Sequence, residues 1–488
     1  MRDERSPSNL TDCGASFNGG VMSLLQACRI PTTLFAFKCK NLEPKMMRSI
    51  LSLEPQAFKL DRRWLFLAPL GVGLLLRGVA LFLEADVTAD ANLWEYGQQG
   101  LCAAQNGGDL CRFYSDGSGS YASAYMPPLL SYLWLILFSL FGDGAIARSV
   151  FLAVGLIASL GSIALTFYLT EKLIRSEPVA FLAAMIVACY PTFVFVATTY
   201  HQTCWAVFFI LAVAAVSVKL SASANTLLYG CLGGALSGLS ALNRSEMLLI
   251  GPVMLLVGVF WDRERKRCLK VCLAIFTVMG LIMAPWMVRN YAEFGRFIPT
   301  AQSDGYNLWK GYNQHTNGSG NLTELTGSAG WTARKEIRSR VAPGDDYEAR
   351  IQEEFMEEFV NDIQHVSAGR LMQLQVTKTG LLWIFDWTDG AVAGKVTYLF
   401  PWVVTNIFAF IGLVVLWRNR RLVAPAPAAI YATAVALLTV AYVATSVHAR
   451  YRMHIEPFIF MAAATGLVGV WARIRGRAFD SYVEGETS

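Results

Sequence analysis

The sequence predicts an all-α polytopic membrane protein, because its apolar residues occur in long blocks and its charged residues lie mostly between them. Of the 488 residues, 54% are hydrophobic and 16% are charged, and the mean hydropathy is +0.41. A soluble chain carries about a quarter charged residues, whereas a helix needs about 20 apolar residues to cross a bilayer. The net charge of +5 does not indicate nucleic-acid binding, since basic residues between apolar blocks orient a membrane protein.

The number of crossings follows from where the basic clusters fall. Apolar blocks lie at roughly 64–84, 127–141, 146–170, 179–199, 203–219, 225–242, 247–261, 270–288, 396–416, 425–446 and 455–472. If every block crossed, the clusters at 263–270, 418–421 and 473–477 would lie outside, against the positive-inside rule. If the short block 127–141, which opens with two prolines, stays in the interface, every cluster lies inside. The sequence therefore predicts about ten crossings, cytoplasmic termini, and a juxtamembrane or re-entrant helix at 127–141.

This topology divides the chain into regions with different environments. Residues 1–60 contain no span and are expected to form a poorly ordered cytoplasmic extension, or, for 1–45, an over-extended start. Residues 61–289 form a membrane module with a first outer loop at 85–145, and residues 396–475 form the last membrane helices. Residues 290–395 are too long for a connector, so we expect a small outer α-rich domain with an amphipathic helix near 346–364. Residues 476–488 are a cytoplasmic tail.

Two carboxylates follow the first apolar block. Asp86 and Asp90 are four residues apart, so on a helix they would share a face, at the boundary between water and lipid. A carboxylate there can act as a general base. On spacing alone, the commoner role is that of solvated acids complementing the dipole of a helix through Trp94 and Tyr96.

Positive charge also occurs on the outer side, where the positive-inside rule does not place it. The residues concerned are Arg244, Arg289, Arg296, Lys310, Arg450 and Arg452. A lipid phosphate or pyrophosphate head-group, bound by guanidinium groups, would explain them. Pairing with Glu246, Glu293 and Glu456 explains them equally well.

Other polar and aromatic residues give weaker signals. His201 and Gln202 follow Tyr190-Pro191 in a short outer turn, and His448 precedes Arg450. The five histidines show no metal-binding spacing. Trp309, Tyr312 and Trp331 fit either stacking on a sugar or an interfacial aromatic belt. Cys102 and Cys111 share the first outer loop, as a disulfide or as two thiols.

Several stretches, in order, resemble the GT-C superfamily of membrane glycosyltransferases, in the bacterial branch related to protein O-mannosyltransferases and the lipid A aminoarabinose transferase. They are Asp90-Ala-x-x-Trp-x-Tyr, Tyr125-Met-Pro-Pro-Leu, Phe141-Gly with Ala147-Arg148, Tyr190-Pro191, Ala284-Pro-Trp-x-x-Arg289-Asn-Tyr, and Arg450-Tyr-Arg-x-x-x-Glu456-Pro. The resemblance extends from about residue 64 to 472. It implies a GT-C-like bundle with interface helices in the first outer loop.

The resemblance also implies an inverting transfer of sugar from a polyprenyl-phosphate carrier, such as undecaprenyl phosphate, to a lipid, glycan or protein acceptor of the cell envelope. The site would lie on the periplasmic side of a bacterial inner membrane. Asp90 would be the base, with Asp86 in reserve, and the donor phosphate would be held by Arg289, Arg450, Arg452, Arg244 and Lys310. We expect the substrates to contact Tyr125, His201, Gln202, Trp309, Tyr312 and Glu456.

The chain departs from the superfamily pattern in two places. Ala91 follows Asp90 where many relatives have Asp-Glu, and His201-Gln202-Thr203 stands where many carry an acid. A metal held by two acids is therefore not favoured, and a metal-independent mechanism is expected with no cofactor beyond the donor. Two other classes stay open. A transporter or flippase of lipid-linked sugars predicts charged or broken helices at mid-membrane, and a scaffold predicts that Asp86 and Asp90 are dispensable. The sugar, the acceptor and the oligomeric state do not follow from the sequence.

Overall fold

The computed structural model describes residues 61–483 except 115–118, 262–264, 322–324 and 385–395. The expected extension at 1–60 lies outside the described residues. The described chain is almost entirely helical, and its one sheet is a hairpin of two antiparallel strands, β1 (Cys111–Tyr114) and β2 (Gly119–Ala122). Cys111 pairs with Ala122 in that hairpin.

A bundle of helices occupies the predicted crossings, and the chain is a multi-pass membrane protein. Within the described part of the chain, seven helices are long and apolar enough to span a membrane: α3 (Arg62–Glu84), α6 (Ala145–Ile174), α9 (Thr203–Ala222), α12 (Arg265–Phe294), α18 (Val396–Arg418), α19 (Pro425–Ala444) and α20 (Glu456–Ile474). Three further helices lie at the other predicted crossings: α7 (Glu177–Cys189), α10 (Thr226–Asn243) and α11 (Met247–Phe260). All-α membrane architecture is confirmed, and the number of crossings stays a prediction.

The helix α5 (Pro128–Phe141) is the block that we expect not to cross. Its 14 residues extend about 21 Å, whereas the hydrocarbon core is about 30 Å thick. Pro128 begins the helix, where a missing N–H costs nothing. The helix packs against α4 (Trp94–Gln105) and α6, with Trp134 fully buried between Phe138 and Phe151. This packing joins the first outer loop to the bundle.

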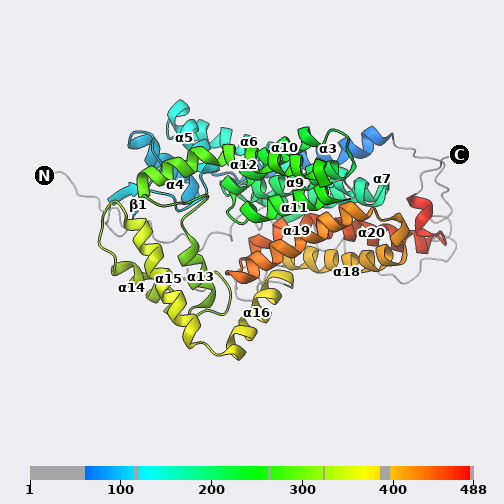
Figure 1. Cartoon of the computed structure of the whole chain (residues 1–488). Coiled ribbons are helices and arrows are strands. Elements are labelled where there is room, and N and C mark those ends of the chain that lie inside the picture. Colours follow the sequence, from blue (N-terminus) through cyan, green and yellow to red (C-terminus); the bar gives the residue numbers. More distant parts are fainter. Residues whose placement is uncertain (1–60, 115–118, 262–264, 322–324, 385–395, 484–488) are drawn as a thin grey trace.

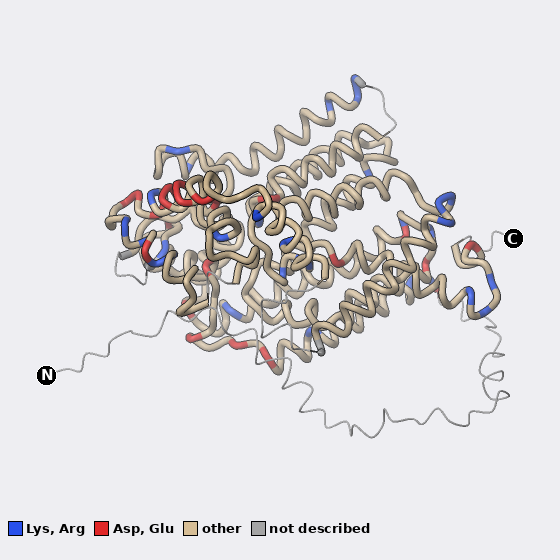
Figure 2. Tube along the Cα trace, turned by 90° about the horizontal axis from the view of Figure 1, so that it is seen from below, with Lys and Arg blue, Asp and Glu red and all other residues tan. Residues whose placement is uncertain are grey.

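The charged residues gather toward the two ends of the bundle (Figure 2). One end carries α4, the hairpin and the outer helices α13 (Asp304–Tyr312), α14 (Ala329–Ser339), α15 (Tyr347–His365) and α16 (Ala368–Trp383) (Figure 1). The helix α15 matches the amphipathic helix predicted near 346–364. Short 3₁₀ turns complete the chain at η2 (Arg420–Leu422), η3 (Ala449–His454) and η4 (Phe479–Tyr482).

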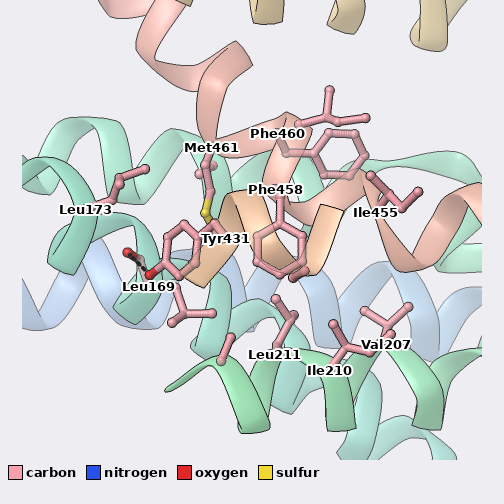
Figure 3. Packing of buried hydrophobic residues seen from close by; sticks show 14 of the residues in the cluster. Leu169, Leu173, Val207, Ile210, Leu211, Tyr431, Ile455, Phe458, Phe460 and Met461 are labelled. Atoms are coloured by element: carbon pink, nitrogen blue, oxygen red, sulfur yellow. Dashed lines mark hydrogen bonds between the residues drawn. The ribbon is translucent and has the colours of Figure 1, made fainter. Parts of the chain in front are cut away.

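The main core lies where α6, α7, α9, α11, α19 and α20 meet. In it Phe458 of α20 lies near Leu211 of α9, and the Tyr431 hydroxyl donates to the Leu169 carbonyl oxygen at 2.8 Å (Figure 3). That hydrogen bond satisfies a hydroxyl that would be costly to bury alone. The core therefore fixes α9 and α19, whose outer ends carry the polar residues described next.

One buried charge in the bundle was not predicted. Arg77 of α3 is fully buried and donates to the carbonyl oxygens of Val187 and Ala188 at 3.1 and 2.9 Å, and to Ser159 Oγ at 2.7 Å. Pro191, four residues after Val187, has no N–H to bond that carbonyl, so the helix breaks between α7 and α8 (Pro191–Val196). Arg77 supplies the missing donors. Two sequence features could have revealed this contact: the single arginine in the first apolar block, and the Tyr190-Pro191 pair that interrupts another block.

Candidate active site

Three segments from distant parts of the sequence meet at the outer end of the bundle. The first is the loop between α3 and α4, the second is the turn before α9, and the third is η3 after α19. The Tyr200 hydroxyl donates to the Asp86 carbonyl oxygen at 2.6 Å, which ties the first two together. The Trp94 ring lies against the His201 ring at 4.8 Å, and the Arg450 guanidinium lies over Trp94 at 5.5 Å. Trp94 is thus the residue around which all three segments assemble.

The two carboxylates of the first loop have different environments. Residues 85–93 are not helical, so Asp86 and Asp90 do not share a helix face, and the helix expected through Trp94 and Tyr96 is α4, which begins after them. Asp86 Oδ1 accepts from the Thr88 N–H at 3.0 Å and from the Thr88 hydroxyl at 2.6 Å, which closes a local turn. Asp90 is exposed, and no described residue bonds its carboxylate. Asp90 is therefore the one of the two that is open to a substrate.

Most of the outer arginines contact a carboxylate. Arg244 pairs with Glu246 and Arg452 with Glu456, which is the alternative that the sequence left open. Arg296 pairs with Glu353, a partner that the sequence did not suggest. The Arg452–Glu456 pair is almost fully buried, and Arg452 also donates to the Tyr398 hydroxyl at 2.6 Å and faces the Trp402 ring at 3.8 Å. Its donors are thus largely occupied by the protein itself, which favours a structural role for both Arg452 and Glu456.

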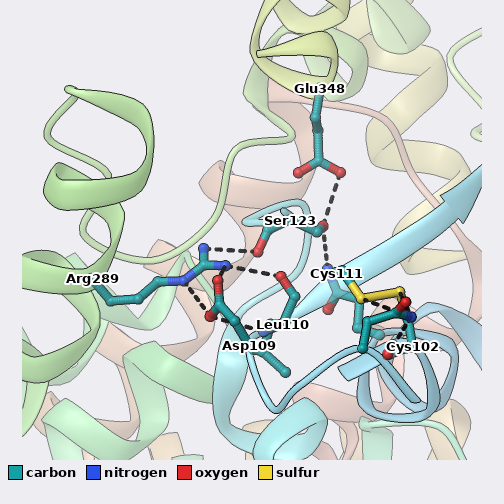
Figure 4. The surroundings of a disulfide bond; sticks show 9 residues. Cys102, Asp109, Leu110, Cys111, Ser123, Arg289 and Glu348 are labelled. Carbon is teal, nitrogen blue, oxygen red and sulfur yellow. Dashed lines mark hydrogen bonds and ion pairs between the residues drawn. A yellow bond between two sulfur atoms is a disulfide. The ribbon is translucent and has the colours of Figure 1, made fainter. Parts of the chain in front are cut away.

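Arg289 also has a protein partner, although not the expected Glu293. Its guanidinium makes a bidentate pair with Asp109 at 2.9 and 2.7 Å, and donates to the carbonyl oxygens of Ser123 and Leu110 (Figure 4). Cys102 and Cys111 form a disulfide in the same loop. Bidentate geometry and four donor contacts make Arg289 an anchor that holds the first outer loop to α12.

Arg450 differs from these arginines. Within the described residues it contacts the faces of Trp94 and Tyr451, at 5.5 and 5.8 Å, and no carboxylate. Its Nε atom is buried without a hydrogen-bond acceptor. A buried donor left unpaired costs about 1–3 kcal/mol, so an anion at this position would be stabilised. Aromatic faces orient a guanidinium without neutralising it.

His201 and Gln202 lie beside this cation. His201 is buried, and its Nδ1 is 2.7 Å from Thr203 Oγ1. Burial, together with the nearby Arg450 and Arg244, holds the pKa of His201 well below its usual range, so the ring is neutral at pH 7. The Gln202 amide, with its nitrogen toward the Asn243 carbonyl, contacts the Tyr96 hydroxyl at 2.7 Å and Arg244 at 3.2 Å. Both residues thus lie in the turn before α9, close to Arg244 and Arg450.

Lys310 and His448 extend the positive region toward the outer domain. The Lys310 ammonium is 3.1 Å from His448 Nε2, and His448 Nδ1 is 3.0 Å from Asn321 Oδ1. Burial, with Lys310 and Arg450 nearby, lowers the pKa of His448 well below its usual range. The imidazole accepts from Lys310 and stays neutral. Lys310 and Arg450 thus bring two positive charges to this region.

The predicted aromatic contacts are largely taken by the protein. Trp309 is only 2% exposed and packs against Tyr306 and Phe355 in the core of the outer domain. The Tyr312 hydroxyl accepts from Gln375, and its ring faces Lys378. These positions do not support stacking on a sugar. Tyr125 lies under the Arg112 guanidinium at 4.5 Å, between the first loop and the outer domain.

No three His, Cys, Asp or Glu side chains converge as metal ligands in the part of the chain that the structure describes. What the arrangement offers chemically is an open carboxylate at Asp90, an unpaired guanidinium at Arg450, and neutral imidazoles between them and the outer domain. Such a pair of groups can accept a proton and stabilise an anion at one surface.

No protein-family model and no curated protein matches this sequence. Solved structures are similar in fold. The oligosaccharyltransferase of Archaeoglobus fulgidus, tethered with an acceptor peptide containing the NVT sequon, is 14% identical over 88% of this chain and 52% of that chain, with a TM-score of 0.53. The archaeal oligosaccharyltransferase AglB, in complex with an inhibitory peptide and a dolichol-phosphate, is 14% identical over 85% and 51%, with a TM-score of 0.51.

ArnT from Cupriavidus metallidurans bound to undecaprenyl phosphate is 12% identical over 83% of this chain and 79% of that chain, with a TM-score of 0.41. The present chain spans about half the length of the archaeal oligosaccharyltransferase. The chain thus shares its overall fold with these archaeal oligosaccharyltransferase structures.

Proposed function

We propose that this protein is an inverting glycosyltransferase that moves a sugar from a polyprenyl-phosphate carrier to an acceptor of the cell envelope, at the outer face of a bacterial inner membrane. The observation that carries the proposal is Arg450, whose guanidinium has no carboxylate partner among the described residues and lies beside the loop that bears Asp90. The archaeal enzyme of similar fold was solved with a lipid phosphate, a dolichol-phosphate. The dolichol-phosphate in that complex is consistent with a donor of this class.

In the proposed reaction, an acceptor hydroxyl attacks the anomeric carbon of the donor sugar from the face opposite the phosphate. The bond between that carbon and the phosphate oxygen breaks, and its electron pair leaves with the phosphate. Arg450 offsets the charge that develops on the departing oxygen, and Asp90 takes the proton of the acceptor hydroxyl. The neutral ring of His201 leaves the charge of Arg450 available to the phosphate.

Two observations bear on the alternative of a transporter for lipid-linked sugars. The break between α7 and α8 and the buried Arg77 are features that a transporter would show. The donors of Arg77 are, however, bonded to two carbonyl oxygens and to Ser159, which explains its burial without a substrate. The open charges lie instead at the outer surface, which favours chemistry there.

The test is transfer of label from a panel of radiolabelled polyprenyl-phosphate sugars in membranes. We expect labelled product with the wild type and none with Asp90→Asn, which removes the base but leaves the shape of the loop. Binding of the carrier by Asp90→Asn should stay within about twofold of wild type, since the donor contacts are cationic.

Asp304 is an exposed acid at the start of α13. Asp304→Asn is therefore the matched control and should transfer the labelled sugar as the wild type does. Normal transfer by Asp90→Asn would move the base to Asp86 or elsewhere. Carrier binding without transfer in every variant, the wild type included, would favour the transporter or a scaffold.

A further inference from the structure

A cavity of about 1180 Å³ opens at the end of the bundle opposite the candidate active site. Helix α9 shows the separation: it begins at Thr203, beside His201, and ends at Ala222, in the cavity wall. Its 20 residues extend about 30 Å, the thickness of a hydrocarbon core. The remaining walls come from the α6–α7 turn, the junction of α11 and α12, the start of α19, and η4.

The cavity carries positive charge that no described carboxylate pairs with. Lys172, Arg175 and Arg267 line it, and none of them contacts a carboxylate within the described residues. The two carboxylates of the wall, Glu171 and Glu177, face Arg62 instead, at 2.8 and 3.6 Å. Arg267 is held toward the cavity by a 2.6 Å hydrogen bond to the Ala224 carbonyl oxygen. Three cations from two different turns thus converge on one space.

The rest of the wall is mixed in character. Trp261, Val218 and Tyr482 supply apolar surface, and Ser221 and Ser481 supply hydroxyls. The helices α7 and α19 both start in this wall, and neither has a side chain capping its first N–H groups. Uncapped helix starts add partial positive charge to that of the three cations. Scattered basic residues are normal at a cytoplasmic membrane surface, but convergence around a half-apolar cavity is not required by topology.

We propose that this cavity binds an anionic phospholipid of the adjacent leaflet, with the phosphodiester head-group between Lys172, Arg175 and Arg267 and the glycerol region against Trp261 and Tyr482. An amphipathic ligand fits because the cavity is both cationic and apolar and opens at the membrane boundary. Basic pockets between membrane helices are known to select such head-groups. The proposal concerns the opposite end of the molecule, so it does not depend on the proposed glycosyl transfer.

The test is the thermal unfolding temperature of the purified full chain in detergent, with added short-chain phosphatidylglycerol or with phosphatidylcholine of the same chains. We expect phosphatidylglycerol to stabilise the wild type and phosphatidylcholine not to. Replacing Lys172, Arg175 and Arg267 together by Gln should weaken the apparent affinity for phosphatidylglycerol about 100-fold, from the usual contribution of cations at an anionic surface.

The matched control replaces Lys266, Arg420 and Arg421 by Gln, which removes the same charge from the same end of the bundle but outside the cavity. The apparent affinity of this control for phosphatidylglycerol should stay within about threefold of that of the wild type. An equal loss in both triple variants would show a diffuse surface charge effect and overturn the proposal. Equal stabilisation by inorganic phosphate or glycerol phosphate would show a soluble-anion site, and would overturn the lipid assignment.

Discussion

At the residue scale, Arg450 differs from the neighbouring arginines in its side-chain contacts. Among the residues that the structure describes, its guanidinium faces two aromatic rings and no carboxylate, whereas the four other arginines of this region each contact a carboxylate. These are Arg244, Arg289, Arg296 and Arg452. We expect Arg450→Ala to weaken binding of the carrier phosphate by roughly 2–5 kcal/mol, the usual cost of removing one partner of a desolvated charge contact. The measurement is carrier binding to purified protein. Arg296→Ala, which opens an exposed pair with Glu353, should change it little. Equal effects of the two changes would remove Arg450 from the site.

Lys378 of α16 gives a prediction about pH. Its side chain is fully buried, its Nζ has no hydrogen-bond acceptor among the described residues, and it lies 3.5 Å from the centre of the Tyr312 ring. Burial lowers the pKa of Lys378 to about 7. Between that value and the ordinary lysine pKa of about 10.4, the unfolded chain binds a proton that the folded chain does not. The free energy of unfolding should therefore rise with pH in this window, by at most about 1.4 kcal/mol per unit.

Lys378→Met should remove this part of the pH dependence and stabilise the protein at pH 7, as measured by thermal unfolding between pH 7 and 9. Lys335→Met is the control, because Lys335 is exposed over the Trp331 ring. If Lys378→Met kept the wild-type dependence of the free energy of unfolding on pH, another group would be responsible for that dependence.

The sequence suggested which residues lie close together better than it suggested their backbone conformation and their side-chain partners. His201, Gln202, Arg244, Arg450 and Lys310 do lie together. The Asp86 carbonyl oxygen accepts a hydrogen bond from Tyr200, a residue 114 positions away, and spacing along the chain does not reveal such a contact. The same limit applies to Arg289, whose partner Asp109 is 180 positions away. Trp309 shows a further limit of sequence reasoning. The sequence does not tell whether an aromatic ring is buried in the protein core or is free to stack on a sugar.

At the element scale, the helix positions were predictable because a membrane leaves few alternatives. Backbone groups in lipid must be bonded within the helix, so long apolar blocks become helices at the expected residues. The hairpin of β1 and β2 was not predicted, since strands of four residues each leave no periodic signal. The packing between particular helices was not predicted either, although the regularly spaced glycines of α10 indicate a close contact with another helix.

Gly230, Gly234 and Gly238 recur every four residues along α10 and face α12, as small residues do where membrane helices approach closely. A Cβ on Gly234 would collide with the Ile275 carbonyl oxygen. Gly234→Ala should therefore force the two helices apart and destabilise the protein by about 1–3 kcal/mol. Thermal unfolding in detergent measures this. Gly280→Ala in α12 has open space around the new Cβ and should cost nothing. Equal stability of the two variants would refute the close approach.

At the scale of the whole molecule, the first outer loop and the outer domain form one structure over the bundle. Glu348 of α15 is buried, and its carboxylate accepts from the Ser123 hydroxyl at 3.0 Å and from the Ala124 N–H at 2.8 Å. Ser123 in turn accepts from Gln99 of α4 at 2.6 Å, and Gln99 accepts from Ser131 of α5. One chain of hydrogen bonds thus connects a helix at about residue 350 with the loop that follows the first span. The site lies between these parts, so its geometry depends on their staying together.

Glu348→Ala should separate them. It leaves the buried Ser123 hydroxyl and Ala124 N–H without this acceptor, which costs about 1–3 kcal/mol for each group left unpaired. We expect faster amide hydrogen exchange at residues 119–125 and in α4, with little change in the main core, because the core of α6, α9 and α19 does not include these residues. Glu353→Ala is the control on the same helix, since its pair with Arg296 is exposed and worth little. If exchange in the first loop were equal in the two variants, the loop would be held by the disulfide and Arg289 alone. The outer domain would then be a separate cap, and substitutions in it away from Lys310 would leave carrier binding unchanged.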